Sequence, residues 1–237
     1  MDWKDRTRLL LKEDKLSVLE NSHILIVGVG GVGAYAAEML CRAGVGQLTL
    51  VDGDKIEPTN RNRQLHALVS TEGQWKTEVL KSRFLDINPD IEVHTINEFL
   101  QGEKTAEVLD MYKYDYVIDA IDTISPKVFL IIETLKRNIP LVSAMGAGGK
   151  TDLSKVQIAD ISKTYQCPLA ATIRKRLKKH GITSGFQAVF SSEISSENAL
   201  RADDEHPYKK TTVGTISYMP AVFGCWCARE VVKEVSL

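Results

Sequence analysis

The stretch from His23 to Gly33, which reads HILIVGVGGVG, constrains the fold of this chain more than any other. Four apolar residues lead directly into a glycine-rich turn, and Ala34 to Ala43 then has helical composition. Such a strand, turn and helix N-terminus form a phosphate cradle, because glycine lets the backbone approach an anion and the free N–H groups of the helix attract it. We therefore expect a nucleotide at this turn, held by Gly28, Gly30, Gly31 and Gly33.

The next predicted strand ends in a carboxylate. Gln47 to Val51 reads QLTLV, and Asp52 follows it, nineteen residues after Gly33. In a fold of this kind an acidic side chain at the end of the second strand reaches the ribose hydroxyl groups of the nucleotide. The pattern indicates an adenine nucleotide, but it does not distinguish NAD from ATP.

The segment after Asp52 is dense in cationic and amide side chains. A dehydrogenase needs no such set beside its cofactor, whereas charge-assisted bonds from arginine neutralise the charge that develops on a triphosphate during transfer. Lys76, at the start of a helix predicted over 76–85, can add a point charge to the same pocket. A solvated loop is the alternative interpretation of the arginines. The side chains in this segment are Asp54, Asn60, Arg61, Asn62, Arg63 and Gln64.

Strands and helices alternate through the first half of the chain, which predicts a doubly wound parallel sheet. The further predicted strands cover 91–96, 114–121 and 139–144, and the further predicted helices cover 7–20, 103–111 and 126–137. Asp119 and Asp122 stand at the end of the strand over 114–121. Polar side chains just past the carboxyl end of a parallel strand face the ligand crevice, so we expect both carboxylates there.

The character of the chain changes after Met145, where a run of glycines predicts a flexible junction. Strands are predicted over 155–159 and 186–190, and a mobile polar loop is predicted from Ser191 to Lys210 before a closing helix that runs to about residue 235. A basic helix over 172–180 suits contacts to RNA phosphates, with a solvated helix face as the alternative. Its cationic side chains are Arg174, Lys175, Arg176, Lys178 and Lys179.

Composition narrows the class of protein. The net charge of -1 over 237 residues gives no global attraction to nucleic acid, so such binding requires a local basic patch. The N-terminus is too charged for a signal peptide, and no apolar run approaches a membrane span. The four cysteines form no CxxC pair, which argues against a disulfide framework and a four-thiolate zinc site. Cys225 and Cys227 lie two apart in the closing helix and should face different sides, with buried packing as the expected role of at least one. We expect a cytoplasmic protein, with peripheral membrane association left open.

Several motifs together resemble the ubiquitin-activating-enzyme-like superfamily, whose members adenylate a carboxylate with ATP and magnesium. They are GVGGVG at 28–33, LVDGDKIEPTNRNRQ at 50–64, Lys76 and VIDAID at 117–122. The segments at 139–150, 160–179 and 214–224 are similar to the branch of tRNA threonylcarbamoyladenosine dehydratases. The resemblance covers nearly the whole chain.

This resemblance implies one α/β adenylation domain of ThiF type over 1–237, with a Rossmann-like, doubly wound sheet that is parallel in its first half and continued by a mixed second half. Residues 1–145 would bind the nucleotide, and residues 146–237 would bind the substrate and form the dimer. The glycine turn would hold the phosphates and Asp52 the ribose. The other nucleotide contacts would come from Asp54, Asn60, Arg63, Gln64 and Lys76.

The resemblance also implies a catalytic set. Arg63 and Lys76 would contact the triphosphate and Asp122 would hold magnesium, while Arg8 would reach the site of the partner subunit in a homodimer. The basic helix would bind the tRNA that carries the modified adenosine. A monovalent cation and a cysteine desulfurase or sulfur-acceptor partner are left open.

The implied reaction activates the threonyl carboxylate of threonylcarbamoyladenosine as an acyl-adenylate. A carbamoyl atom of the same base then attacks, expels AMP and closes a ring with net loss of water, and this closure needs no enzyme thiol. One alternative is an adenylating activator of a ubiquitin-like sulfur-carrier protein, although such enzymes often carry two CxxC zinc pairs that this chain lacks. An NAD-dependent oxidoreductase and a non-catalytic nucleotide-binding scaffold are also left open.

Overall fold

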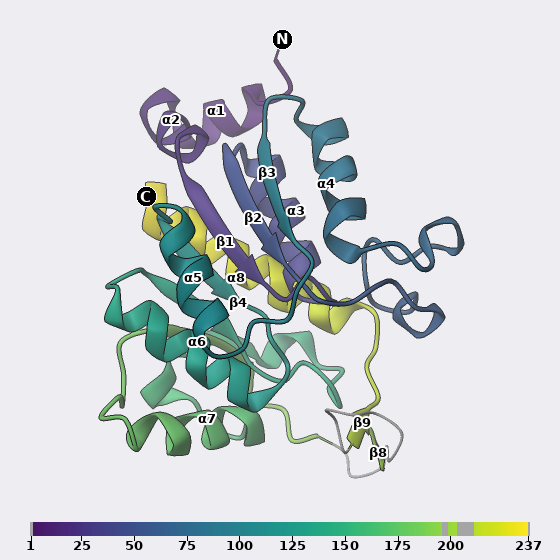
Figure 1. Cartoon of the computed structure of the whole chain (residues 1–237), viewed down its shortest axis with the longest axis vertical. Coiled ribbons are helices and arrows are strands. Elements are labelled where there is room, and N and C mark those ends of the chain that lie inside the picture. Colours follow the sequence, from purple (N-terminus) through teal and green to yellow (C-terminus); the bar gives the residue numbers. More distant parts are fainter. Residues whose placement is uncertain (1, 196–198, 203–210, 237) are drawn as a thin grey trace.

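The computed structural model describes residues 2–195, 199–202 and 211–236. Its central layer is a seven-stranded sheet in the order β3-β2-β1-β4-β5-β7-β6 (Figure 1). Neighbouring strands are parallel except β6, which runs antiparallel to β7 at one edge. The strands are β1 (His23–Val27), β2 (Gln47–Val51), β3 (Glu92–Ile96), β4 (Tyr116–Asp119), β5 (Leu141–Ala144), β6 (Val156–Asp160) and β7 (Gln187–Ser191). The predicted doubly wound sheet with a mixed continuation is confirmed.

Helices cover both faces of this sheet. The first face carries α3 (Gly33–Ala43), α4 (Lys76–Ile87) and α8 (Tyr218–Ser236), and the second carries α5 (Glu103–Met111), α6 (Ile124–Lys136) and α7 (Pro168–Lys178). In β1, Ile24 and Ile26 belong to the core of the first face, whereas Leu25 and Val27 belong to the core of the second. Because both faces are covered, the strand reads as a continuous apolar run.

Short elements complete the described part of the chain. Single turns of 3-10 helix cover Pro58–Asn60, Val69–Thr71, Leu153–Lys155 and Ile161–Lys163, and a separate hairpin pairs β8 (Leu200–Ala202) with β9 (Thr211–Val213). No helix among the described residues is long and apolar enough to cross a membrane.

Two predictions about local structure need correction. The helix predicted over 7–20 is two helices, α1 (Asp5–Leu11) and α2 (Glu13–Glu20), because Lys12 has a φ of 73° that interrupts the hydrogen-bond ladder. At the glycine junction, the N–H of Gly149 donates to the carbonyl of Gly214 at 2.8 Å. The loop predicted over 191–210 contains β8, and residues 196–198 and 203–210 of it lie outside the described residues.

Candidate functional site

The glycine turn lies between the end of β1 and the start of α3, pressed against the end of β4. Gly28 has a φ of +85°, and a Cβ atom there would lie 2.8 Å from the carbonyl oxygen of Ala120. A Cβ on Gly33 would lie 1.9 Å from the carbonyl oxygen of Gly28. Neither position can accept a side chain without a backbone shift, so glycine is required for the turn itself.

The other two glycines of the turn face different neighbours. A Cβ on Gly30 would come no closer than 3.7 Å to Nε2 of Gln64, so that position faces open space beside an amide. A Cβ on Gly31 would lie 3.0 Å from Cβ of Pro220, in the first turns of α8. The turn is therefore lined by the 60–64 segment and by α8.

Asp52 fastens the glycine turn to the end of β2. Its carboxylate accepts hydrogen bonds from the N–H of Val29 at 2.8 Å and from the N–H of Asp54 at 2.9 Å. Burial raises the pKa of Asp52, and the nearby ammonium of Lys76 opposes that shift. The carboxylate predicted for the ribose therefore lies beside the turn.

Lys76 begins α4, as predicted, and its ammonium lies among the carboxylates of this site. Its side chain is 5% exposed, with Nζ 2.7 Å from Oδ2 of Asp54 and 3.8 Å from Oδ1 of Asp52. The structure thus brings together three predicted nucleotide contacts that are separated by up to twenty-four residues in the sequence. A buried cation at this place can neutralise phosphate charge with little loss to solvent screening.

The polar segment over 60–64 wraps across the glycine turn. Asn60 is buried, and its Oδ1 accepts from the N–H of Glu57 at 3.1 Å. Arg63 donates to the carbonyl of Thr59 at 3.0 Å and to Oδ1 of Asn62 at 2.8 Å. Asn62 in turn donates to the carbonyl of Thr215 at 3.0 Å, which links this segment to the second half of the chain.

Two buried polar side chains near the turn have no hydrogen-bond partner among the described residues. They are Gln64, through Oε1, and His66, through both ring nitrogens. Buried polar atoms are nearly always paired, so an unpaired acceptor beside a nucleotide turn is consistent with a ligand contact. Burial lowers the pKa of His66 to about 3, and Lys76 adds to that shift, so the ring is neutral at pH 7. Sequence reasoning did not single out His66, and its place two residues after Gln64 was the one available signal.

The two carboxylates predicted to follow β4 differ in environment. Asp119 is fully buried and pairs with Lys127 at 2.8 Å, so the prediction that it faces the ligand crevice is wrong. Asp122 is exposed in the loop between β4 and α6. Ala120, two residues before it, contacts the glycine turn. Of these two carboxylates, Asp122 is therefore the one that can contact a ligand at the turn.

Arg8 lies apart from this site within one chain. It is on α1, at the amino end of the strands, whereas the glycine turn is at their carboxyl end (Figure 1). Its guanidinium pairs with Asp2 at 3.1 Å, with Asp5 at 2.5 Å and with Glu13 at 2.7 Å. A role for Arg8 in catalysis would require a second subunit.

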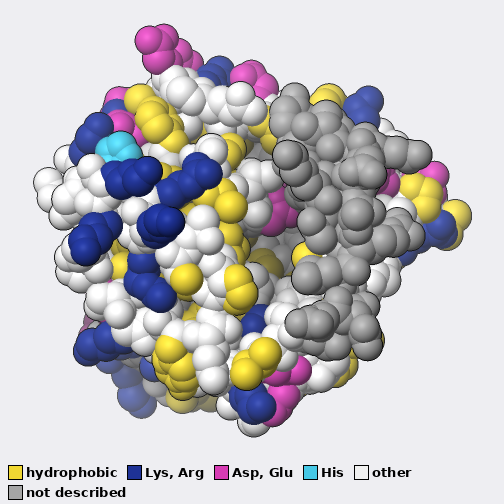
Figure 2. Space-filling view, turned by 90° about the horizontal axis from the view of Figure 1, so that it is seen from below, with side chains coloured by type: hydrophobic (Ala, Val, Ile, Leu, Met, Phe, Trp, Pro, Cys, Tyr) yellow, Lys and Arg dark blue, Asp and Glu magenta, His cyan; other side chains and the backbone are white. Residues whose placement is uncertain are grey.

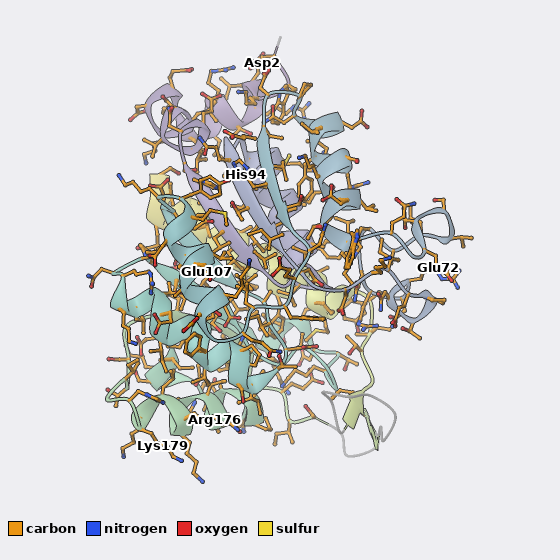
Figure 3. The ribbon with its side chains drawn as sticks, viewed as in Figure 1. Asp2, Glu72, His94, Glu107, Arg176 and Lys179 are labelled. Atoms are coloured by element: carbon orange, nitrogen blue, oxygen red, sulfur yellow. The ribbon has the colours of Figure 1, made fainter. Side chains whose placement is uncertain are left out.

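The basic helix predicted over 172–180 is the carboxyl-terminal part of α7, which ends at Lys178, two residues earlier than predicted. It lies at the lower end of the molecule in Figure 3, where Arg176 and Lys179 are labelled. Arg174 is used within the fold, because it donates to the carbonyl of Thr164 at 2.9 Å. Arg176 donates to Oγ of Ser125 at 2.9 Å, three residues after Asp122. Figure 2, which views this end, shows Lys and Arg side chains gathered beside a hollow. The exposed cations of this patch are Lys175, Arg176, Lys178 and Lys179.

Comparison with known proteins identifies the family. The ThiF family profile matches residues 5–236. The chain belongs to the ThiF family.

The similarity of this chain to its relatives in the family covers different fractions of its length. A tRNA threonylcarbamoyladenosine dehydratase from Bacillus subtilis is 45% identical, over 97% of this chain and 93% of the relative. The crystal structure of an Escherichia coli tRNA N6-threonylcarbamoyladenosine dehydratase in complex with ATP superposes with a TM-score of 0.88 at 36% identity, over 98% of this chain and 94% of that one. The molybdopterin-synthase adenylyltransferase of Escherichia coli is 31% identical, over 65% of this chain and 61% of the relative.

Cys225 and Cys227 of this ThiF-family chain differ in burial. Cys227 is buried, and burial raises its pKa to about 12, so it stays a neutral thiol. Cys225 is exposed on another side of α8, as the spacing predicted, and partial desolvation raises its pKa too. No group of three or more His, Cys, Asp or Glu in the described part of the chain could hold a metal ion by itself.

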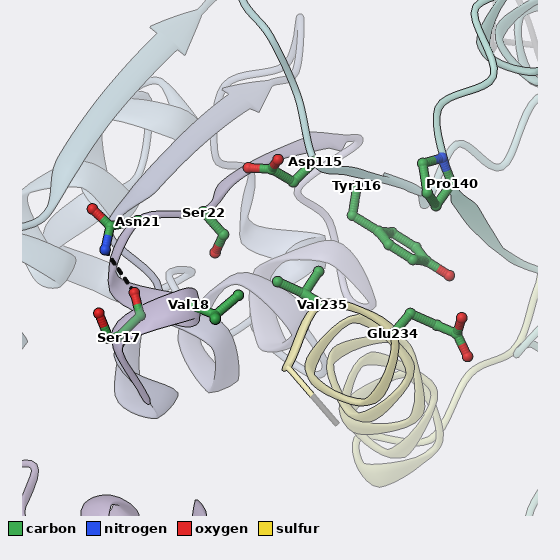
Figure 4. Close-up of a pocket in the computed structure, with 9 residues that line it drawn as sticks. All are labelled: Ser17, Val18, Asn21, Ser22, Asp115, Tyr116, Pro140, Glu234 and Val235. Atoms are coloured by element: carbon green, nitrogen blue, oxygen red, sulfur yellow. Dashed lines mark hydrogen bonds between the residues drawn. The ribbon is translucent and has the colours of Figure 1, made fainter. Parts of the chain in front are cut away.

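Two cavities lie away from the glycine turn. One of about 480 Å³ opens at the amino end of the strands between α2 and the end of α8 (Figure 4). Its walls include Ser22, Asp115, Tyr116 and Glu234. The other, of about 340 Å³, lies at the start of α7 and includes Arg174 in its wall. Neither is lined by a predicted nucleotide-binding residue.

Proposed function

We propose that this protein uses ATP to dehydrate threonylcarbamoyladenosine in tRNA, closing a ring through adenylation of the threonyl carboxylate. The observation that carries this proposal is the extent of similarity. The dehydratase from Bacillus subtilis is similar over 97% of the chain, and so through both halves, whereas the molybdopterin-synthase adenylyltransferase is similar over 65%. The second half, which holds α7, is where an RNA-modifying enzyme would differ from an activator of carrier proteins.

ATP fits the residues around the glycine turn. A dehydratase of Escherichia coli was crystallised with ATP, at 36% identity to this chain. The turn offers backbone N–H groups at the start of α3 to the phosphates, and Asp52 would accept from the ribose. The unpaired Oε1 of Gln64 offers a further polar contact, and Asn60 would shape the pocket wall. Arg63, Lys76 and its partner Asp54 would lie along the triphosphate.

Magnesium fits the exposed carboxylate of Asp122. This ion is held in nucleotide enzymes by one or two carboxylates together with substrate phosphates, not by a full cage of protein ligands. A single carboxylate beside the phosphate turn, without a cluster of three ligands among the described residues, agrees with that mode. The ion would neutralise charge on the phosphates. A monovalent cation and a sulfur-transfer partner stay predictions of the family resemblance.

The side chains of the site have a limited task in this reaction. The threonyl carboxylate displaces pyrophosphate from ATP, and the carbamoyl group then displaces AMP from the acyl-adenylate. Arg63 and Lys76 would stabilise the charge on the leaving phosphates. Since nucleophile and electrophile belong to the same modified base, tethering supplies effective molarities on the order of 10⁵ M or more. Neither Cys225 nor Cys227 is needed for the closure.

The tRNA would bind along α7. The exposed cations Lys175, Lys178 and Lys179 can contact phosphates without giving up bonds within the fold. Arg176, through its bond to Ser125, joins this surface to the start of α6, which follows the loop that carries Asp122. An RNA backbone on α7 would therefore bring a nearby base toward the adenylation site. In this proposal residues 1–145 bind the nucleotide and residues 146–237 bind the RNA and contribute to the dimer.

A homodimer would give Arg8 its predicted role. No residue of α1 is buried, and Leu9 and Leu10 on this helix are 76% and 80% exposed. Two neighbouring leucines this exposed are consistent with a surface that a partner covers. Arg8 would exchange its local acidic partners for the nucleotide of the partner subunit.

The test is a mass measurement. The protein is incubated with ATP, Mg²⁺ and tRNA that contains threonylcarbamoyladenosine, and the nucleosides are digested and weighed. We expect loss of one water that depends on ATP. No loss of water under conditions where calorimetry shows ATP binding would contradict the proposal. Pyrophosphate exchange that needs a carrier protein, not tRNA, would favour the sulfur-carrier activator, and tight binding of NAD without ATP would favour an oxidoreductase.

A further inference from the structure

A buried ion pair lies beneath the loop that carries Asp122. Asp119 is the last residue of β4, and Lys127 is in the first turn of α6. Neither side chain exposes any surface, and Nζ lies 2.8 Å from Oδ2. Replacing buried ion pairs with apolar side chains is often neutral or stabilising, so stability alone does not account for a charged pair here. Its geometry suggests another role.

The pair ties down both backbone polar groups of Ile121. Oδ1 of Asp119 accepts from the N–H of Ile121 at 3.1 Å, and Nζ of Lys127 donates to the carbonyl of Ile121 at 3.0 Å. That carbonyl belongs to the peptide unit that joins Ile121 to Asp122. Because the peptide unit is planar, fixing its oxygen fixes the plane from which the backbone of Asp122 continues. Ser143 on β5 donates to Oδ2 of Asp119 at 2.6 Å, which holds the carboxylate in turn.

The same segment forms a wall of the glycine turn. The N–H of Ala120 donates to the carbonyl of Val27 at 2.8 Å. A Cβ on Gly28 would lie 2.8 Å from the carbonyl oxygen of Ala120, so the two backbones are in close contact. The loop from Asp119 to Asp122 is therefore held on one side by the turn and on the other by Lys127.

We propose that Lys127 is a positioning residue of the adenylation site, which with Asp119 fixes the backbone that presents Asp122 to the metal-bound triphosphate. The inference rests on the proposed role of Asp122 in holding Mg²⁺. The buried ammonium lies beneath the site and acts through the Ile121 carbonyl. Loss of this bond loosens Asp122 but leaves the contacts that a nucleotide makes with the glycine turn and Asp52. Groups that orient a metal ligand typically change metal affinity by 10- to 100-fold.

The test combines Lys127→Met with Asp119→Asn. Methionine is unbranched like lysine but lacks the donor and is one atom shorter, and asparagine removes the carboxylate charge that would otherwise be left unpaired. Two dissociation constants are measured by calorimetry, for ATP with Mg²⁺ and for AMP without metal. We expect the first to rise about tenfold and the second to stay at the wild-type value. The Mg²⁺ concentration for half-maximal water loss should rise in parallel.

Two further variants separate the possible causes. Leu130→Ala, on the same buried face of α6, lowers stability without removing a donor to Ile121, and it should leave both dissociation constants unchanged. Asp122→Asn tests the proposed function itself and should weaken Mg-ATP binding as the double variant does. If Asp122→Asn weakens Mg-ATP binding and the double variant does not, the role of Lys127 is refuted and that of Asp122 stands. If Asp122→Asn has no effect, both fail.

A parallel loss of AMP affinity in the double variant would also refute the proposal, since it would indicate general damage to the nucleotide site. Should the double variant not fold, Lys127→Gln with Asp119→Asn replaces the ion pair with two amides. Glutamine is one atom shorter than lysine and does not reach the Ile121 carbonyl as the ammonium does. The same rise for Mg-ATP is expected, and an unchanged value would refute the inference.

Discussion

Gly28 and Gly73 form a matched pair that tests the phosphate turn. Both have positive φ, +85° and +79°, so alanine would be strained at either position. A Cβ on Gly28 would lie 2.8 Å from the carbonyl oxygen and 2.9 Å from the carbonyl carbon of Ala120, whereas a Cβ on Gly73 meets nothing within 4 Å. The two substitutions therefore share the backbone strain and differ in the clash.

The expected magnitudes follow from this difference. An L-residue in the left-handed region costs about 1–2 kcal/mol, which is the full expected effect of Gly73→Ala on the free energy of unfolding. Gly28→Ala must also move the backbone of residue 120 or the turn itself, and overpacking of this kind costs about 1–3 kcal/mol more. The same movement displaces the N–H groups that would meet the phosphates, so ATP affinity should fall in Gly28→Ala and stay unchanged in Gly73→Ala.

Urea unfolding measures the stability of both variants, and calorimetry measures their affinity for ATP. Equal slopes of the free energy of unfolding against urea concentration would show that the substitutions change stability and not the compactness of the unfolded or native state. Equal destabilisation of the two variants would refute the argument from the Ala120 contact. Wild-type ATP affinity in a folded Gly28→Ala variant would refute the assignment of the turn to the phosphates.

Other predictions address the second subunit, the RNA surface and a buried histidine. Arg8→Ala should lower the rate of water loss at least about tenfold, because its charge would stabilise the leaving phosphates. Arg6→Ala, on the exposed side of the same helix, should leave the rate unchanged. Equal rates in the two variants would count against a contribution of Arg8 to the site of the partner subunit. Lys175→Glu with Lys178→Glu should weaken tRNA binding and reduce the slope of log affinity against log salt by about 2, and an unaltered slope would favour a solvated helix face. Burial lowers the pKa of His66 to about 3, so the unfolded chain binds more protons than the folded chain between pH 6.5 and about 3. The free energy of unfolding therefore decreases as the pH is lowered across that window. Relative to His66→Leu, the wild type should lose up to about 1.4 kcal/mol per pH unit in urea unfolding, and parallel profiles would refute this.

Much of the fold could be predicted because periodicity and turn chemistry agreed locally. The helix predicted over 103–111 is α5, and the strand predicted over 47–51 is β2. Gly44, in the left-handed conformation with a φ of 100°, caps α3 directly after Ala43, where the stretch of helical composition ends. In these segments the sequence pattern and the tertiary packing favour the same structure.

Other features depended on contacts that local patterns do not encode. The break between α1 and α2 occurs at Lys12, a residue type that rarely has positive φ, so no breaker residue marked it. The hairpin of β8 and β9 consists of two strands of three residues each, too short for a clear alternation. No local pattern marks Lys127 as buried near the start of the helix predicted over 126–137, yet its side chain is fully buried against Asp119 at the end of β4.

The topology explains why residues distant in sequence converge on one turn. β1 lies between β2 and β4, and the chain proceeds outward through β2 and β3 on one side and through β4 and β5 on the other. The turn after β1 is thus at the point where the order of strands reverses, and ligands of open parallel sheets bind at such points. Asp52 approaches the turn from the end of β2, and Asp122 follows the end of β4. At the end of β4, two carboxylates three residues apart have different roles. The buried carboxylate of Asp119 anchors the loop, and the exposed carboxylate of Asp122 is presented to the ligand.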